Sequence, residues 1–385
     1  MSAIALSFGS PVIPKQLGKR KSSSVKWKFW KSAPPPEQPV RVPGLSAEDY
    51  EKLRLIMEMV TPRSHPNLNH LGEVVRNVRI LSLNIKNLGY DLARQMSAAL
   101  PVPSETAPRH VGLRTSLSTQ AAIESDWVAH WCRQLQIPVV FHRKIWELAY
   151  VLQAMYENGH IRPGANGLGF GSGSEPMSSY LASQGVRSTV TDLPADEAQA
   201  MGWIETNQHA SSLDNAFHPH LVTREQFDQH VDFRAVDMNA IPDDLQGYDF
   251  CWSICALEHL GTIERGLRFI ERSLDTVRPG GLAVHTTEFN IEADGPTIDN
   301  WPTVLFQRRH FEELALRLEA KGHKVAPFDF DPGNKILDKF VDLPPWQNDA
   351  NTAPLTPWLG NSHHLKVSAD GFVCTCAGIV VTKAG

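Results

Sequence analysis

Four glycines at alternate positions are the residues of this sequence whose types and spacing most clearly indicate chemistry: Gly167, Gly169, Gly171 and Gly173. Glycines at this density let a backbone turn tightly from a strand into a helix and approach a ligand closely. Asp192 follows about 20 residues later, at the end of a short extended run, and an acid at that distance is placed to bond ribose hydroxyls. Together these features predict that this part of the chain binds a nucleotide-like cofactor.

The spacing within the glycine loop narrows the choice of cofactor. A dinucleotide fingerprint requires G-x-G-x-x-G or A, but in each frame of the loop the last position falls on Ser172, Ser174 or Pro176. A P-loop requires a lysine, which this loop lacks. The loop therefore carries G-x-G-x-G and neither of these two phosphate-binding patterns.

The elements after the loop alternate between strands and helices. Extended apolar runs are predicted at 231–236, 248–253 and 282–287, and a helix is predicted at 262–277 because its apolar residues step by four and three. Residues 278–281, Arg-Pro-Gly-Gly, end that helix with both helix breakers. Such alternation predicts a doubly wound, mostly parallel sheet whose ligands lie beyond the carboxyl ends of the strands.

In this order, the segments from about residue 140 to residue 385 resemble the class I S-adenosylmethionine (SAM)-dependent methyltransferases. The resemblance implies an α/β, Rossmann-like class I methyltransferase fold with a doubly wound, mostly parallel seven-stranded sheet and an N-terminal helical extension. It also implies SAM as the cofactor. The residues that it places around SAM are the glycines Gly167, Gly169, Gly171 and Gly173, then Asp192 for the ribose, Asp237 and Met238 for the adenine, and Trp252 and Ser253 beside the cofactor.

One position departs from that family. Where the similar enzymes usually have an acidic residue that anchors the loop and the cofactor ammonium, this chain has Gly167. Another group must then take that role, and Glu175 is the nearest acidic candidate. The missing acid also supports an alternative in which the protein binds a ligand or partner at a SAM-type fold without catalysis.

Candidate catalytic residues follow the fourth predicted strand of the sheet. Methyl transfer from SAM is an in-line displacement in which the protein positions the nucleophile and removes its proton. A hydroxyl nucleophile needs a base with a pKa near neutrality, and Glu258 and His259 lie at the predicted edge of the site. His285 and Glu288, at the end of the next strand, are expected to face the same crevice as second candidates. A structural role for His259 beside the cofactor is the alternative.

A metal-dependent alternative involves the same segment. Cys255-x-x-Glu258-His259 with His285 is similar to the Glu-x-x-Glu-His arrangement of the small-RNA 3′-terminal 2′-O-methyltransferases. Cys255 replaces the first glutamate, and a thiolate is a poor ligand for a hard cation such as Mg²⁺. We therefore expect no metal at this site and keep an RNA 2′-O-methyltransferase as an alternative function.

The favoured function is SAM-dependent methyl transfer to a hydroxyl oxygen of a small molecule or glycan. The stretches 252–261 and 286–290 resemble bacterial methyltransferases associated with polysaccharide biosynthesis. A net charge of −5 argues against nucleic acid as a partner, because phosphate binding requires a basic face. Five scattered cysteines, no apolar run of about 20 residues and no secretory signal predict a cytoplasmic protein without a transmembrane segment.

Composition divides the 385 residues into three segments. Residues 1–44 are basic and proline-rich and are expected to be a disordered tail, with weak contact to a membrane surface as an alternative. Residues 45–140 are expected to be helical and to form a lid or an oligomerisation region. Apolar residues from Val74 to Leu92 repeat there by four and three, which predicts either packing within the monomer or a homodimer. Residues 141–385 are expected to be the SAM-binding domain.

Overall fold

The computed structural model describes residues 46–58, 68–101, 108–172, 175–194, 213–344 and 360–385. Contacts divide the chain into two compact units, residues 2–80 and residues 81–385. The predicted tail, residues 1–44, and Gly173 of the glycine loop lie outside the described residues. Within the described part of the chain, no helix is long and apolar enough to cross a bilayer.

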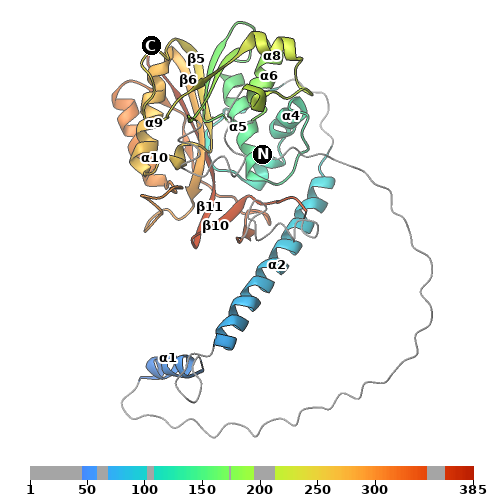
Figure 1. The fold of residues 1–385 in the computed structure, drawn as a ribbon, viewed down its shortest axis with the longest axis vertical. Coiled ribbons are helices and arrows are strands. Elements are labelled where there is room, and N and C mark those ends of the chain that lie inside the picture. Colours follow the sequence, from blue (N-terminus) through green and yellow to red (C-terminus); the bar gives the residue numbers. More distant parts are fainter. Residues whose placement is uncertain (1–45, 59–67, 102–107, 173–174, 195–212, 345–359) are drawn as a thin grey trace, which may run out of the picture. The chain divides into compact units, whose positions relative to one another are not determined.

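A nine-stranded sheet forms the centre of the unit 81–385 (Figure 1). Its strands are β2 (Asn166–Phe170), β3 (Arg187–Asp192), β4 (Val231–Ala235), β5 (Tyr248–Ile254), β6 (Val277–Asn290), β7 (Lys324–Val325), β9 (Val341–Asp342), β10 (Lys366–Ala369) and β11 (Phe372–Thr382). Their order is β4-β3-β2-β5-β6-β11-β10-β9, and β7 also pairs with β11. The neighbours from β4 to β6 are parallel, whereas β11 is antiparallel to β6, β7 and β10.

This topology confirms the predicted α/β, Rossmann-like, mostly parallel sheet. β2 lies between β3 and β5, so the strand order reverses at β2. Doubly wound sheets bind their ligands at such a reversal, beyond the carboxyl ends of the strands. Seven strands, β2 to β7 and β11, correspond to the predicted seven, and the short strands β9 and β10 extend the sheet beyond β11.

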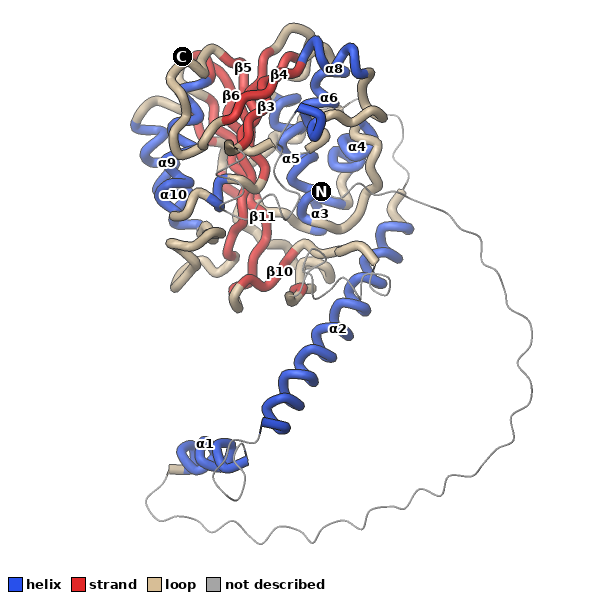
Figure 2. Tube along the Cα trace, in the orientation of Figure 1, coloured by secondary structure: helices blue, strands red, loops and turns tan. Residues whose placement is uncertain are grey.

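Helices cover both faces of the sheet (Figure 2). The helices on one face are α4 (Asp126–Gln134), α5 (Arg143–Glu157), α6 (Met177–Ser183) and α8 (Arg224–His230), and those on the other are α9 (Ile263–Thr276) and α10 (Arg308–Ala320). Successive residues of a strand point to opposite faces, so each strand contributes to two separate cores. On β5, Phe250 and Trp252 enter the core beside α5, whereas Cys251 enters the core beside α9.

Helix α9 shows how the sequence pattern produces these layers. It begins after Thr262, whose hydroxyl accepts a hydrogen bond from the backbone N–H of Arg265 at 3.1 Å. Its apolar stripe is buried against β5 and β6, as predicted. The helix ends at Thr276, just before residues 278–281, as expected. These residues nevertheless belong to strand β6, which begins at Val277. The pairing of β6 with β5 shifts its register between Tyr248 and Phe250. The strand is therefore longer at both ends than the predicted run 282–287.

The N-terminal region is helical, as expected. Its elements are α1 (Ala47–Glu58), α2 (Leu68–Ala98) and α3 (Gln120–Ile123), with β1 (Thr115–Ser116) pairing with β8 (Phe328–Asp329) in a separate sheet. The observed division after residue 80 differs from the expected boundary at residue 140. Val128 and Trp131 of α4 are buried in the same core as α5, which places residues 81–140 in the unit that contains the sheet.

Candidate active site

Three loops meet at Gly171, directly beyond the carboxyl end of β2. Gly171 has a φ of +55°, which glycine adopts without strain. A Cβ built on Gly171 would lie 2.8 Å from the Cβ of Ala256, which follows β5. The same Cβ would lie 3.4 Å from the Sδ of Met238, which follows β4. The glycine turn thus contacts the loops of two other strands at the point where the strand order reverses.

Two aromatic rings occupy the space beside the other glycines of β2. A Cβ on Gly167 would lie 2.4 Å from Cζ of Phe250, and a Cβ on Gly169 would lie 2.5 Å from Cζ2 of Trp252. Both rings are fully buried in the core beside α5 and have no room to move aside. An acidic side chain therefore cannot fit at residue 167, which gives a steric reason for the glycine there.

Among the residues that the structure describes, three buried polar atoms around the glycine turn have no hydrogen-bond partner: Ser172 Oγ, Glu175 Oε2 and Trp252 Nε1. Leaving a buried polar group unpaired costs about 1–3 kcal/mol, so each such group requires an explanation. Ser172 Oγ and the Trp252 ring both approach Gly169. Burial raises the pKa of Glu175 well above its usual range, and the nearby charge of Lys144 acts in the opposite direction. The turn thus presents a hydroxyl, a carboxyl and an indole N–H that a ligand could pair.

The two acids expected to hold a cofactor follow neighbouring strands. Asp192 ends β3 and Asp237 follows β4, and both side chains are half-buried. Asp192 Oδ1 accepts the backbone N–H of Leu193 at 2.8 Å, and Asp237 Oδ1 accepts that of Asn239 at 2.8 Å. These bonds orient both carboxylates at the carboxyl edge of the sheet, which is also the edge that carries Gly171.

A second group of polar side chains lies at the start of α5 and on β6. Lys144 Nζ donates to Glu147 Oε2 at 3.1 Å, and the hydroxyl of Thr286 donates to the same oxygen at 3.0 Å. Arg143 forms an ion pair with Glu288. Helix α5 therefore supplies two cations to a cluster of polar side chains from β6 on this face of the sheet, called the crevice below.

Two cysteines complete this group. Cys255 follows β5 with a φ of +46°, and Cys376 lies on β11, on the far side of β6. Their Sγ atoms are 3.7 Å apart, and Cys376 Sγ donates to Glu147 Oε1 at 2.9 Å. Burial raises the pKa of Cys376 to about 12 and that of Cys255 well above its usual range. The sequence did not indicate Glu147 or Cys376 as site residues.

The predicted Glu258–His259 pair lies in a short helix (Leu257–His259) beside this group. Thr287 Oγ1 donates to Glu258 Oε2 at 3.0 Å, whereas the buried Oε1 has no partner. His259 Nδ1 lies 3.0 Å from the carbonyl oxygen of Pro302, which indicates a proton on Nδ1 and a basic Nε2. That Nε2 is 4.0 Å from Glu258 Oε1. Burial raises the pKa of Glu258 to about 7 and lowers that of His259.

His285 and Ser253 lie on the opposite side of the sheet from this crevice. His285 Nδ1 is 2.8 Å from Ser253 Oγ, and Nε2 is 3.0 Å from Ser273 Oγ of α9. The imidazole is fully buried beside Phe269, and burial lowers its pKa to about 3. The expectation that His285 and Glu288 face one crevice is wrong, because residues three apart on a strand point to opposite faces.

The metal-ligand set considered from the sequence does not assemble, because it includes His285. Within the described residues, two other groups bring ligand-type atoms within 4.8 Å of one another: Glu147 with Cys255 and Cys376, and Cys255 with Glu258 and Glu288. Both groups lie in the crevice, and Cys255 belongs to both.

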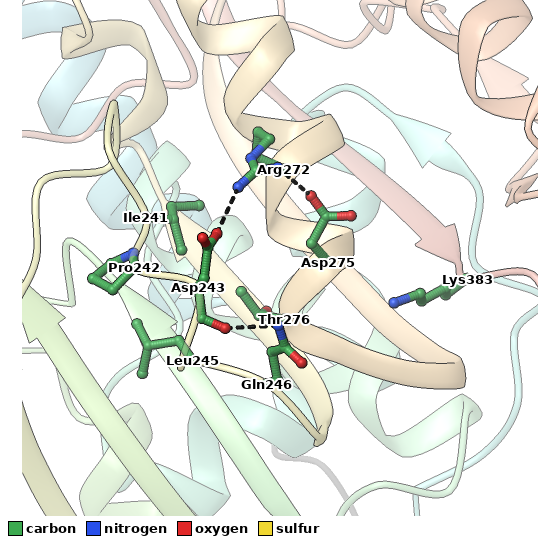
Figure 3. Close-up of a pocket in the computed structure, with 9 residues that line it drawn as sticks. All are labelled: Ile241, Pro242, Asp243, Leu245, Gln246, Arg272, Asp275, Thr276 and Lys383. Carbon is green, nitrogen blue, oxygen red and sulfur yellow. Dashed lines mark hydrogen bonds and ion pairs between the residues drawn. The ribbon is translucent and has the colours of Figure 1, made fainter.

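A separate pocket lies away from these residues (Figure 3). It is lined by the loop before β5, the end of α9 and Lys383 after β11. Arg272 pairs there with Asp243 at 3.4 Å and with Asp275 at 3.0 Å. These segments lie at the amino ends of β5 and β6, so the pocket is at the edge of the sheet opposite the glycine turn.

No protein-family model and no curated protein matches the sequence. Solved structures similar to the chain include the [4+2]-cyclase SpnF, with 16% identity, coverage of 62% of this chain and 82% of that chain, and a TM-score of 0.39. Another is the methyltransferase domain of bacterial CtHen1-C, with 14% identity, coverage of 61% and 95%, and a TM-score of 0.36. A third is phosphoethanolamine N-methyltransferase 2 of Haemonchus contortus in complex with SAM, with 13% identity, coverage of 61% and 52%, and a TM-score of 0.35. The assignment of the fold rests on the strand order of the sheet.

Proposed function

We propose that this protein is a SAM-dependent methyltransferase that transfers a methyl group to a hydroxyl oxygen of a small molecule or glycan. The observation that carries the proposal is the set of three unpaired buried polar atoms around the glycine turn, at the reversal point of a doubly wound sheet. The motifs that resemble class I methyltransferases meet at the same turn. SAM has amino, carboxylate, ribose and adenine groups that could pair with such atoms.

The residues around the turn fit this cofactor. Gly171 lets the backbone approach the methionine part of SAM closely. The Asp192 carboxylate, held by its own loop, is placed to accept hydrogen bonds from the ribose hydroxyls. Asp237 and Met238 follow the next strand and are the residues that would border the adenine.

The cofactor ammonium requires a carboxylate that residue 167 cannot supply. Phe250 fills the space beside Gly167, so the acid must come from another element. Glu175 is buried near the turn and its Oε2 is unpaired. We assign the ammonium contact to Glu175 for this reason, and a positive ligand group there would favour the ionised carboxylate.

When bound, SAM supplies a methyl group on a positively charged sulfur. The acceptor hydroxyl must lose its proton as its oxygen bonds to the methyl carbon. His259 Nε2 is the proton acceptor in this proposal, because Nδ1 is held by the carbonyl of Pro302. Glu258 Oε1, 4.0 Å from Nε2, is placed to stabilise the charged imidazole.

The test is calorimetric titration of the full-length protein with SAM and, separately, with NAD. We expect SAM to bind with a micromolar Kd and NAD not to bind. Asp192→Ala should weaken SAM binding about 10- to 100-fold, because a hydrogen bond to a charged group contributes about 1.5–3 kcal/mol. Asp232→Ala, at an exposed aspartate on β4, is the matched control and should keep the wild-type affinity.

Other outcomes would favour the alternative functions. Unchanged SAM affinity in Asp192→Ala would show that the motif assignment is wrong. SAM binding that appears only with Mg²⁺ would favour the RNA 2′-O-methyltransferase. A protein that binds no SAM under any of these conditions would favour a non-catalytic binding role.

A further inference from the structure

Three side chains from distant parts of the chain converge beside the glycine turn: Glu147 of α5, Cys255 after β5 and Cys376 of β11. Cys376 Sγ is 3.7 Å from Cys255 Sγ and 2.9 Å from Glu147 Oε1. Glu147 and Cys376 are buried, whereas Cys255 is partly accessible. The group therefore has soft and hard donor atoms, one of them on a partly exposed residue.

We propose that Cys255, Cys376 and Glu147 form a binding site for Zn²⁺. Two thiolates bound tetrahedrally to zinc at about 2.3 Å have sulfur atoms about 3.8 Å apart. The observed separation of 3.7 Å matches this distance without any movement of the backbone. Thiolate ligands select zinc over Mg²⁺, which prefers oxygen. Metal binding displaces the thiol protons, including the one that Cys376 shares with Glu147.

The surrounding charges favour a divalent cation, even before the carboxyl of Glu258 is counted. Glu147 pairs with Lys144, and Glu288 pairs with Arg143, so these four side chains carry no net charge together. Two thiolates would add two negative charges, which one Zn²⁺ neutralises. Arg143 Nη1 also lies 3.9 Å from Cys376 Sγ and would stabilise its thiolate form.

Two independent observations point to a ligand at this place. Glu258 Oε1 is buried and has no hydrogen-bond partner among the described residues, with only His259 Nε2 at 4.0 Å, and the ligand atoms of Cys255, Glu258 and Glu288 lie within 4.8 Å of one another. Glu258 is therefore a ready fourth ligand. Cys255 also holds a φ of +46°, a conformation that costs a non-glycine residue energy and is over-represented at functional sites.

The experiment measures metal on the full-length protein and does not depend on SAM. Protein purified without chelators is analysed for zinc by mass spectrometry, and its Zn²⁺ affinity is measured against a chromophoric chelator. Replacement of zinc by Co²⁺ should produce the absorption of cobalt–thiolate bonds. We expect one equivalent of zinc and an affinity reduced by about 100-fold or more in Cys255→Ser and in Cys376→Ser.

Cys132→Ser is the matched control, because Cys132 is a buried free cysteine of α4 outside the group. It should bind zinc as the wild type does and show the same cobalt–thiolate absorption. Circular dichroism of each variant establishes that it is folded. Absence of zinc and of cobalt–thiolate absorption in the folded wild type would overturn the proposal, as would equal affinity in all three variants or a disulfide between Cys255 and Cys376.

Discussion

Phe250 occupies the volume that a side chain at residue 167 would need. Its ring stacks on Trp252, with ring centroids 5.8 Å apart, so both aromatic residues hold β5 closely against β2. This packing also decides where an acidic residue can lie near the glycine turn. An acidic side chain does not fit at residue 167 of β2, and the first acidic residue after the turn in the sequence is the buried Glu175, just before α6.

The two histidines considered as bases have different surroundings and should respond differently to alanine. His259→Ala should lower the methyl-transfer rate about 100-fold or more and leave the Kd for SAM unchanged. His285→Ala should instead lower the free energy of unfolding by about 1–3 kcal/mol, because it removes the His285 contact of the buried Ser253 hydroxyl and one of the two hydrogen bonds of the Ser273 hydroxyl, which also donates to the carbonyl oxygen of Ile270. Radiolabelled methyl transfer to a screened acceptor and thermal unfolding separate the two effects. A fully stable His285→Ala with a lost rate would contradict the assignment.

At the scale of elements, one buried ionic network joins α2 to β9. Lys86 Nζ donates to Asp342 Oδ1 at 2.6 Å, and Tyr90 Oη donates to Oδ2 at 2.7 Å. His364 Nδ1 also lies 2.7 Å from Oδ2. Lys86 and Tyr90 are four residues apart and therefore share one face of the helix. The carboxylate of Asp342 thus holds the second half of α2 against the extended edge of the sheet.

Asp342→Asn should lower the free energy of unfolding by about 3–5 kcal/mol at pH 7, because it leaves Lys86 buried without its counter-ion. Burial alone would raise the pKa of Asp342, but the hydrogen bonds and charges of His364 and Lys86 hold it below its usual value. The stabilisation is therefore present above about pH 4 and is lost as the pH falls through that lowered pKa. Urea unfolding followed by tryptophan fluorescence should show the difference between wild type and variant shrinking at acid pH.

Asp370→Asn is the control for this measurement. Asp370 is exposed in the turn between β10 and β11, where asparagine tolerates the positive φ as well as aspartate does. It should match the wild type at both pH values. An Asp342→Asn protein as stable as the wild type at pH 7 would show that the network contributes no stability.

At the scale of the whole molecule, the chain combines a unit that contains the sheet with a smaller N-terminal unit. A row of apolar residues on α2 is exposed: Val74, Val78, Leu81, Ile85 and Leu88, with Leu88 74% exposed. Spacing by four and three is the pattern of helices that pair along a seam. Packing within the monomer and pairing in a homodimer are the two alternatives that the sequence left open for this row, and the mass of the protein in solution distinguishes them.

Removal of residues 1–80 tests the division of the chain, but it leaves Leu81, Ile85 and Leu88 of the row in place. The unit 81–385 contains both large buried cores, so the shortened protein should keep its SAM affinity and a Tm within about 4 °C of the wild type. Light scattering of the full-length protein tests the row: a homodimer gives twice the chain mass, and replacing the exposed Leu81 and Leu88 by glutamate should then give the single mass. A shortened protein that fails to fold would show that the N-terminal unit is needed by the sheet.

Local sequence patterns were sufficient to predict the alternation of strands and helices after about residue 140 and the glycine turn, whereas the reversal of the strand order at β2 came from the structure. Periods of two and 3.6, helix breakers and glycine spacing act over a few residues, and neighbouring residues therefore carry the information. Because side chains alternate between the two faces of a strand, the sequence alone already places His285 and Glu288 on opposite faces of β6. The alternation therefore argues against His285 as a residue of the same site. The steric exclusion at Gly167 also needed the structure, because Phe250 reaches it from another strand.

Only the tertiary structure decided that Cys376 and Glu147 lie beside Cys255. β11 pairs antiparallel with β6, which places Cys376 opposite Glu288 and within reach of a cysteine 121 positions earlier in the chain. No local sequence pattern determines that β11 pairs with β6, because strand pairing depends on the packing of the whole sheet. The residue types around the crevice were visible in the sequence, but their convergence depends on contacts between segments far apart in the chain.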